Sequence, residues 1–97
     1  MDYRIEFTKT AVKDIENLDP KIASRLLKKL KEISLLETPL KLSKQLTGFL
    51  LPTYRFRIGD YRIIFRLNSE AANKITIIMV LKISHRKNAY DEIPYHE

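Results

Sequence analysis

The chain contains 97 residues, of which 44% are hydrophobic and 31% charged, and it carries a formal net charge of +6. This length supports one domain with one hydrophobic core, and the balance of apolar and charged side chains excludes an intrinsically disordered protein. The lack of cysteine excludes disulfides and thiolate chemistry. Because residues 1–5 lack an apolar signal core and the longest apolar run is too short to cross a bilayer, we expect one cytoplasmic domain over residues 1–97 without a membrane partner.

The first part of the chain predicts a strand followed by two helices. Apolar residues alternate with charged ones over residues 3–7, as in a strand. Thr8 or Thr10 then offers an N-cap to a short helix with apolar positions at 11, 12, 15 and 18. Asp19 caps a second helix that has Pro20 at its first position, and we expect this helix to run to Thr38-Pro39.

Basic residues follow one side of the second predicted helix, and the sequence pI is near 9.7. The charge favours an anionic partner such as nucleic acid, an acidic protein or a phospholipid surface, without choosing among them. A row of charges on a helix is most often simply a solvated side. The residues in the row are Lys21, Arg25, Lys28, Lys29 and Lys31.

The second part of the chain predicts a sheet. Residues 38–52 contain Pro39, Gly48 and Pro52 and are interpreted as an irregular connection. Three strand-like segments follow, over residues 53–58, 61–67 and 75–83. The order β-α-α-β-β-β predicts an α+β fold in which an N-terminal helical hairpin packs on one face of a mostly antiparallel sheet.

The segment around Gly59-Asp60 is typical of a tight β-hairpin with a two-residue turn. Such a turn fixes the register and pairs Ile58 with Tyr61 and Arg57 with Arg62. Because side chains alternate across a strand, one face then carries apolar and aromatic residues for the core. The other face, here named the arginine face, carries Arg55, Arg57, Arg62, Ile64 and Arg66.

The arginine face carries a local cost that folding does not explain, because like charges directly opposite each other destabilise a sheet. Arginine at all four basic positions favours bidentate binding of phosphate, which lysine cannot copy. The alternative interpretation is that these arginines are solvated, or paired with Asp60, Glu70 or the acidic C-terminal residues.

The hairpin and the segment after the last strand resemble a known family. The sequences YRFRIGDYRIIF (residues 54–65) and VLKISHRKNAY (residues 80–90) are similar to the RelE branch of the RelE/ParE toxin superfamily. Members are toxins of type II toxin–antitoxin systems, and RelE-type members enter the ribosomal A site and cut the mRNA there. The resemblance implies that this chain is such an mRNA endoribonuclease and inhibits translation. Further similar positions are Phe7, Ala11, Leu18 and residues 46–48.

By position, the basic residues of the family fall at Arg55, Arg57, Arg62 and Arg86, and its C-terminal tyrosine falls at Tyr90. Ser84 stands where glycine is common, and Arg86 and Tyr90 are closer together than in some members. We interpret Arg57, Arg62, Arg86 and Tyr90 as catalytic. We assign RNA and phosphate binding to Arg55, Arg57, Arg62, Arg66, His85 and Lys87.

Cleavage by attack of a 2′-hydroxyl on the adjacent phosphate needs a proton acceptor, stabilisation of charge and a donor to the leaving 5′-oxygen. His85 and His96 are the only histidines, and the terminal position of His96 disfavours a two-histidine mechanism. The hairpin arginines would hold the phosphate, Arg86 would neutralise or protonate the leaving oxygen, and Tyr90 would stack on a base or help remove the proton. Alternatively, His85 makes a hydrogen bond that fixes the strand end and Tyr90 packs a short helix.

The sequence has no ligand spacing typical of a metal site and no glycine-rich phosphate loop, so we expect no metal and no cofactor. Two other functions stay open. One is a ParE-like toxin that inhibits DNA gyrase without cutting nucleic acid, and the other is a non-catalytic RNA- or ribosome-binding module. The resemblance implies a cognate antitoxin as partner, mRNA in the A site and ribosomal RNA as further partners, and DNA contact only through the antitoxin complex.

Overall fold

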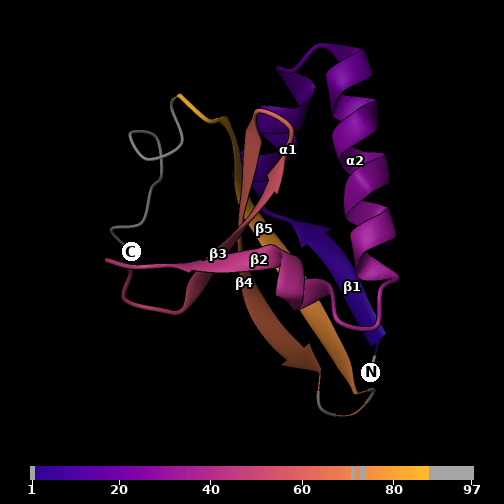
Figure 1. The fold of residues 1–97 in the computed structure, drawn as a ribbon, viewed down its shortest axis with the longest axis vertical. Coiled ribbons are helices and arrows are strands. Elements are labelled where there is room, and N and C mark those ends of the chain that lie inside the picture. The colour runs from indigo at the N-terminus through magenta and orange to yellow at the C-terminus, as the bar shows by residue number, and fades with distance from the viewer. Residues whose placement is uncertain (1, 71, 73, 88–97) are drawn as a thin grey trace.

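A computed structural model describes residues 2–70, 72 and 74–87. One sheet with the strand order β1-β5-β4-β3-β2 packs against two α-helices (Figure 1). β1 is parallel to β5, and the other neighbouring strands are antiparallel. The predicted α+β fold is confirmed. The elements are β1 (Asp2–Phe7), α1 (Lys9–Glu16), α2 (Pro20–Ser34), the 3-10 helix η1 (Pro39–Leu42), β2 (Ser43–Leu46), β3 (Thr53–Ile58), β4 (Tyr61–Glu70) and β5 (Ile75–His85).

Both helices begin at caps that the sequence predicts. Thr8 Oγ1 accepts a hydrogen bond from Ala11 N at 3.2 Å, and Asp19 Oδ1 accepts one from Lys21 N at 2.8 Å. α2 ends at Ser34, about one turn before the predicted stop at residues 38–39, so that boundary was wrong. The apolar residues that follow Ser34 are exposed, and no buried stripe continues the helix there.

Residues 38–52 are more regular than predicted, because they contain η1 and the additional strand β2. β2 forms the edge of the sheet and pairs with β3, with Ser43 opposite Phe56 and Leu46 opposite Thr53. Its sequence, Ser-Lys-Gln-Leu, is short and polar, as is common for an edge strand. β4 and β5 also extend beyond their predicted ends, to Glu70 and His85.

The β3–β4 hairpin has the predicted register, with Arg57 opposite Arg62 and Ile58 opposite Tyr61. Gly59 adopts a φ of 58° in the turn, in the left-handed region that favours glycine. On the helix side of the hairpin, the rings of Phe56 and Phe65 stack with centroids 4.4 Å apart. Burial of each such side chain contributes about 1.5–3 kcal/mol, and alternation leaves the arginines on the opposite side of the sheet.

α1 covers the part of β5 that extends beyond β1. Thr8 N donates to Val80 O at 3.0 Å, and Asp14 Oδ2 accepts from Ile83 N at 2.9 Å. Asp14 also forms an ion pair of 2.9 Å with Lys82 Nζ, and the two side chains are only 15% and 14% exposed. These contacts fix the end of β5, from which the chain continues to the predicted site. Within the described residues, no helix is long and apolar enough to cross a membrane.

Candidate functional site

The arginine face lies on the side of the sheet opposite the hydrophobic core. Arg57 and Arg62 are directly opposite each other across β3 and β4, and Ser84 of β5 is opposite Arg62. Adjacent strands lie about 4.8 Å apart, so the two arginines begin from neighbouring backbone positions. Arg57 is exposed and Arg62 is half-buried. This part of the face therefore carries two arginines on neighbouring backbone positions near the hairpin turn.

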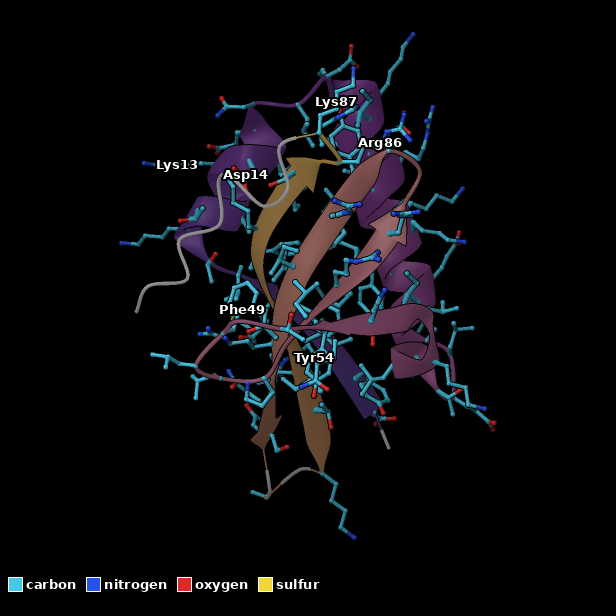
Figure 2. All side chains as sticks on the ribbon, turned by 60° about the vertical axis from the view of Figure 1, so that its left-hand side comes forward. Lys13, Asp14, Phe49, Tyr54, Arg86 and Lys87 are labelled. Atoms are coloured by element: carbon cyan, nitrogen blue, oxygen red, sulfur yellow. The ribbon has the colours of Figure 1, made fainter. Side chains whose placement is uncertain are left out.

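Arg86 joins these residues through the backbone. Its amide donates to Asp60 O at 2.7 Å, and its carbonyl accepts a hydrogen bond of 3.3 Å from Arg62 Nη1. Its Nε lies 3.8 Å from Asp60 Oδ1, a loose ion pair between two exposed side chains. Figure 2 shows Arg86 and Lys87 at the end of the sheet that carries the β3–β4 turn. Three of the four predicted catalytic residues, Arg57, Arg62 and Arg86, are thus brought together.

Two carboxylates of the described residues, Asp60 and Glu70, lie on elements that neighbour this cluster. Of the acids that the sequence offers as partners, Asp60 pairs loosely with Arg86, and Glu70 pairs with Arg4 of β1 at 3.0 Å. A phosphodiester offers the oxygen acceptors and the negative charge that such a group of guanidiniums binds best. The arrangement can therefore bind a nucleic-acid backbone and stabilise additional negative charge that develops on it.

The other arginines of the face lie further from the turn. Arg55 has Lys44 of β2 opposite it on one side and Ile64 on the other. Within the described part of the chain, Arg55 Nε is buried without a hydrogen-bond partner. Arg66 Nε donates to Thr53 Oγ1 at 3.2 Å, which ties Arg66 to the start of β3. Arg55 can extend a phosphate-binding track, whereas Arg66 also has a structural contact.

His85 lies on the other side of the sheet from the arginine face. It is opposite Tyr61, and the two rings meet edge to face with centroids 5.3 Å apart and an interplanar angle of 83°. Its Nδ1 accepts a hydrogen bond of 3.3 Å from Lys87 N. The structure thus contains the contact that the alternative interpretation of His85 predicts, and it does not bring this imidazole to the arginines.

Tyr90 and His96 lie outside the described residues, as does any helix that Tyr90 would pack. Lys87 is exposed and directly follows Arg86. Among residues 2–70, 72 and 74–87, no group of three or more histidine, cysteine, aspartate or glutamate side chains could hold a metal ion.

Sequence reasoning missed three residues that shape the site. Lys44 extends the cationic row, but β2 is too short and polar to be recognised. Lys82 lies opposite Ile64, beside a bulge between Ile64 and Phe65 that changes which residues of β5 share a face. Asp14, which lies on α1 and 68 residues before Lys82 in the chain, accepts a hydrogen bond from Lys82 Nζ. Figure 2 shows Asp14 on the flank of β5. Only the alternation in β5 could have indicated Lys82, and the bulge hides it.

The chain is similar to known toxins over nearly its whole length. A sequence profile described as "ParE toxin of type II toxin-antitoxin system, parDE" matches residues 5–90. Toxin RelG of Mycobacterium tuberculosis is 31% identical over 90 residues, which cover 93% of this chain and 98% of RelG.

Solved toxin structures share the fold. A chain of a RelBE toxin–antitoxin complex from Mycobacterium tuberculosis superimposes with a TM-score of 0.67 and 29% identity, covering 89% of this chain and 100% of that one. A chain of the archaeal RelE–RelB complex of Pyrococcus horikoshii superimposes with a TM-score of 0.61 and 30% identity, covering 89% of this chain and 97% of that one. The shared sequence over residues 5–90 and the shared fold show that the chain belongs to the RelE/ParE toxin superfamily of type II toxin–antitoxin systems.

Proposed function

We propose that this toxin is an endoribonuclease that cuts mRNA in the ribosomal A site and needs no metal ion. The observation that supports this best is the cluster of Arg57, Arg62 and Arg86 at one end of the sheet. Placing Arg57 directly opposite Arg62 lowers the stability of the sheet, and neither side chain belongs to the core. Binding of a negatively charged ligand would compensate for the repulsion between them. A gyrase inhibitor would not require this cluster.

The proposed reaction is an internal transfer on the RNA. The 2′-oxygen forms a bond to the adjacent phosphorus, the bond from phosphorus to the 5′-oxygen breaks, and the products are a 2′,3′-cyclic phosphate and a 5′-hydroxyl. Arg57 and Arg62 stabilise the charge on the phosphate oxygens. Arg86 neutralises the leaving 5′-oxygen or donates a proton to it, and Tyr90 helps remove the 2′ proton or stacks on a base. The proton lost from the 2′-hydroxyl balances the proton gained by the 5′-oxygen.

Neither arginine nor tyrosine exchanges protons readily near neutral pH, so each contribution is weak alone. Precise placement of the RNA must supply a large part of the acceleration, because a well-oriented internal nucleophile avoids most of the entropic cost of the reaction. We propose that the ribosome provides this placement. The toxin should therefore cut slowly, or not at all, on free mRNA.

We further propose a cognate antitoxin, because the similar structures are toxin–antitoxin complexes. A groove of about 720 Å³ between α1 and α2 has an apolar lining that includes Leu18 and Leu27, with Lys28 and Lys31 beside them. This combination suits an amphipathic segment with acidic residues along its edges. Leu27 is 39% exposed, so a partner that binds in the groove can cover this side chain.

The second candidate function is inhibition of DNA gyrase, which the similarity to the ParE profile favours. A supercoiling assay separates the two candidates. A ParE-like toxin inhibits gyrase and leaves mRNA intact, whereas the proposed ribonuclease has the opposite pattern.

Single-turnover cleavage on ribosomes programmed with a defined A-site codon tests the proposal. Arg57→Ala and Arg62→Ala should each lower the cleavage rate by about 100-fold or more, the range seen when a group that stabilises transition-state charge is removed. Arg4→Ala is the matched control, because Arg4 is 47% exposed and lies on β1, paired with Glu6 and Glu70. It should retain the wild-type rate.

Tyr90→Phe and Arg86→Ala test the remaining catalytic assignments in the same assay, and each should slow cleavage while the protein stays folded. Arg62→Lys should also be slow, because a bidentate contact is lost although the charge is kept. A non-catalytic RNA-binding module would be favoured if the alanine variants lose RNA binding alone and Arg62→Lys behaves like the wild type. Failure of the folded, antitoxin-free wild type to cut would show that the proposal is wrong.

A further inference from the structure

A second cavity lies at the tip of the β3–β4 hairpin, on the helix side of the sheet. Its volume is about 390 Å³, within the range of about 300–1,000 Å³ that small-molecule sites occupy. Leu26 and Ile58, which are buried, form its floor, and Arg25 and Asp60, which are exposed, stand at its mouth. The rest of the lining consists of Ile22, Gly59, Tyr61 and His85. We refer to it as the hairpin-tip pocket.

We infer that the hairpin-tip pocket binds one nucleotide of a single-stranded RNA, with the base inside and the phosphate at Arg25. Tyr61 and His85 both line the pocket and meet edge to face with ring centroids 5.3 Å apart, so the two rings do not stack on each other. Single-stranded bases stack on tyrosine, histidine and arginine side chains in many RNA-binding proteins. An apolar floor under two such rings suits a base better than it suits a sugar or a phosphate.

The charged residues at the mouth of the pocket determine the orientation of the bound nucleotide. Arg25 is exposed and attracts phosphate, whereas the carboxylate of Asp60 repels a second anionic group. A free phosphate or a pyrophosphate would therefore gain little from entering. A nucleotide places its neutral base in the pocket and needs a cation at the rim, where Arg25 stands.

The pocket also connects two basic surfaces. Asp60 at its mouth is the residue whose carbonyl and carboxylate hold Arg86 beside the arginine face. Arg25 belongs to the basic row of α2, with Lys21 one turn before it. RNA bound on the arginine face can thus continue around the hairpin tip towards α2. This role in mRNA recognition rests on the proposed function, whereas nucleotide binding by the pocket does not depend on cleavage.

Titration of the full-length, antitoxin-free toxin with 5′-AMP, followed by NMR of isotope-labelled isoleucine and leucine methyl groups, tests the inference. The methyl signals of Ile22, Leu26 and Ile58 should shift in a saturable way, because these residues line the pocket. Ribose 5-phosphate, which lacks the base, should leave them unshifted. The shifts should persist in the Arg57→Ala/Arg62→Ala variant, which keeps the pocket but lacks the paired arginines.

Variants of the pocket separate stacking from a structural role of His85. His85→Ala and Arg25→Ala should each weaken AMP binding, by about tenfold for the stacking residue. His85→Phe should restore binding, because it returns an aromatic ring without the acceptor for Lys87 N. Lys29→Ala is the control on the same helix, since Lys29 is exposed and pairs only loosely with Glu32 at 3.9 Å.

The inference is wrong if the pocket methyl groups show no saturable response to AMP, or respond equally to ribose 5-phosphate. It is also wrong if the response disappears in the Arg57→Ala/Arg62→Ala variant, because AMP binding would then belong to the arginine face. A third contrary result is a shift of these signals only on addition of an antitoxin, which would make the pocket a protein-docking site. A wild type that binds AMP in the pocket but does not cut mRNA would overturn the proposed function and leave this inference standing.

Discussion

The contact between Asp14 and β5 should contribute strongly to stability, and Asp14→Ala measures it. The substitution removes hydrogen bonds of 2.9 Å from Lys82 Nζ and from Ile83 N, and it leaves the lysine charge in a place that is only 14% exposed. Breaking a buried ion pair costs about 3–5 kcal/mol, and a hydrogen bond to a charged group contributes about 1.5–3 kcal/mol. Because both side chains still reach water, we expect a loss of about 2–3 kcal/mol in the free energy of unfolding.

Urea unfolding followed by circular dichroism provides the measurement, with an unchanged m-value as evidence that the native and unfolded states stay comparable. Glu32→Ala is the matched control, since it breaks an ion pair of 3.9 Å between side chains that are 53% and 56% exposed. That loss should stay below about 0.5 kcal/mol. Asp14→Asn keeps an oxygen acceptor for Ile83 N and should lose less than Asp14→Ala. Equal losses in Asp14→Ala and Glu32→Ala would refute the reasoning.

Three further substitutions test the sheet. Ser84→Ala should leave the free energy of unfolding unchanged or raise it by up to about 1 kcal/mol, because within the described residues the buried Ser84 Oγ has no hydrogen-bond partner; a clear loss in urea unfolding would contradict this. Arg57→Thr should raise stability by about 0.2–1 kcal/mol while it slows mRNA cleavage, because it relieves the charge opposite Arg62; lower stability would argue against repulsion. Gly59→Ala should lower the free energy of unfolding by about 1 kcal/mol and Tm by about 4–8 °C, because alanine is strained at a φ of 58°. An unchanged Tm in calorimetry would contradict this.

The β3–β4 hairpin could be predicted in detail because local chemistry determines it. The two-residue turn at Gly59-Asp60 fixes the register, and a shift by one residue would turn the apolar side chains away from the core. These two constraints are sufficient to place Arg57 opposite Arg62 from the amino-acid sequence alone. The capping residues Thr8 and Asp19 are equally local, and both helix starts follow from them.

Features that depend on distant partners could not be predicted. β2 contributes only four mostly polar residues, and its pairing with β3 gives it a strand conformation that its own sequence does not indicate. The apolar run in β5 conceals a bulge, so its two faces could not be assigned, and the position of His85 on the helix side followed only from its pairing with Tyr61. The link between Asp14 and Lys82 joins elements far apart in the chain.

Cleavage of one mRNA in two states tests the central claim most directly. The antitoxin-free toxin is mixed with the mRNA either free in solution or bound to ribosomes with a defined codon in the A site, and cut positions are mapped by primer extension. We expect a cut within the A-site codon, with a 2′,3′-cyclic phosphate on the upstream fragment, and little or no cleavage of free mRNA. No cut on programmed ribosomes, or a cut that persists in Arg62→Ala at the wild-type rate, would contradict it.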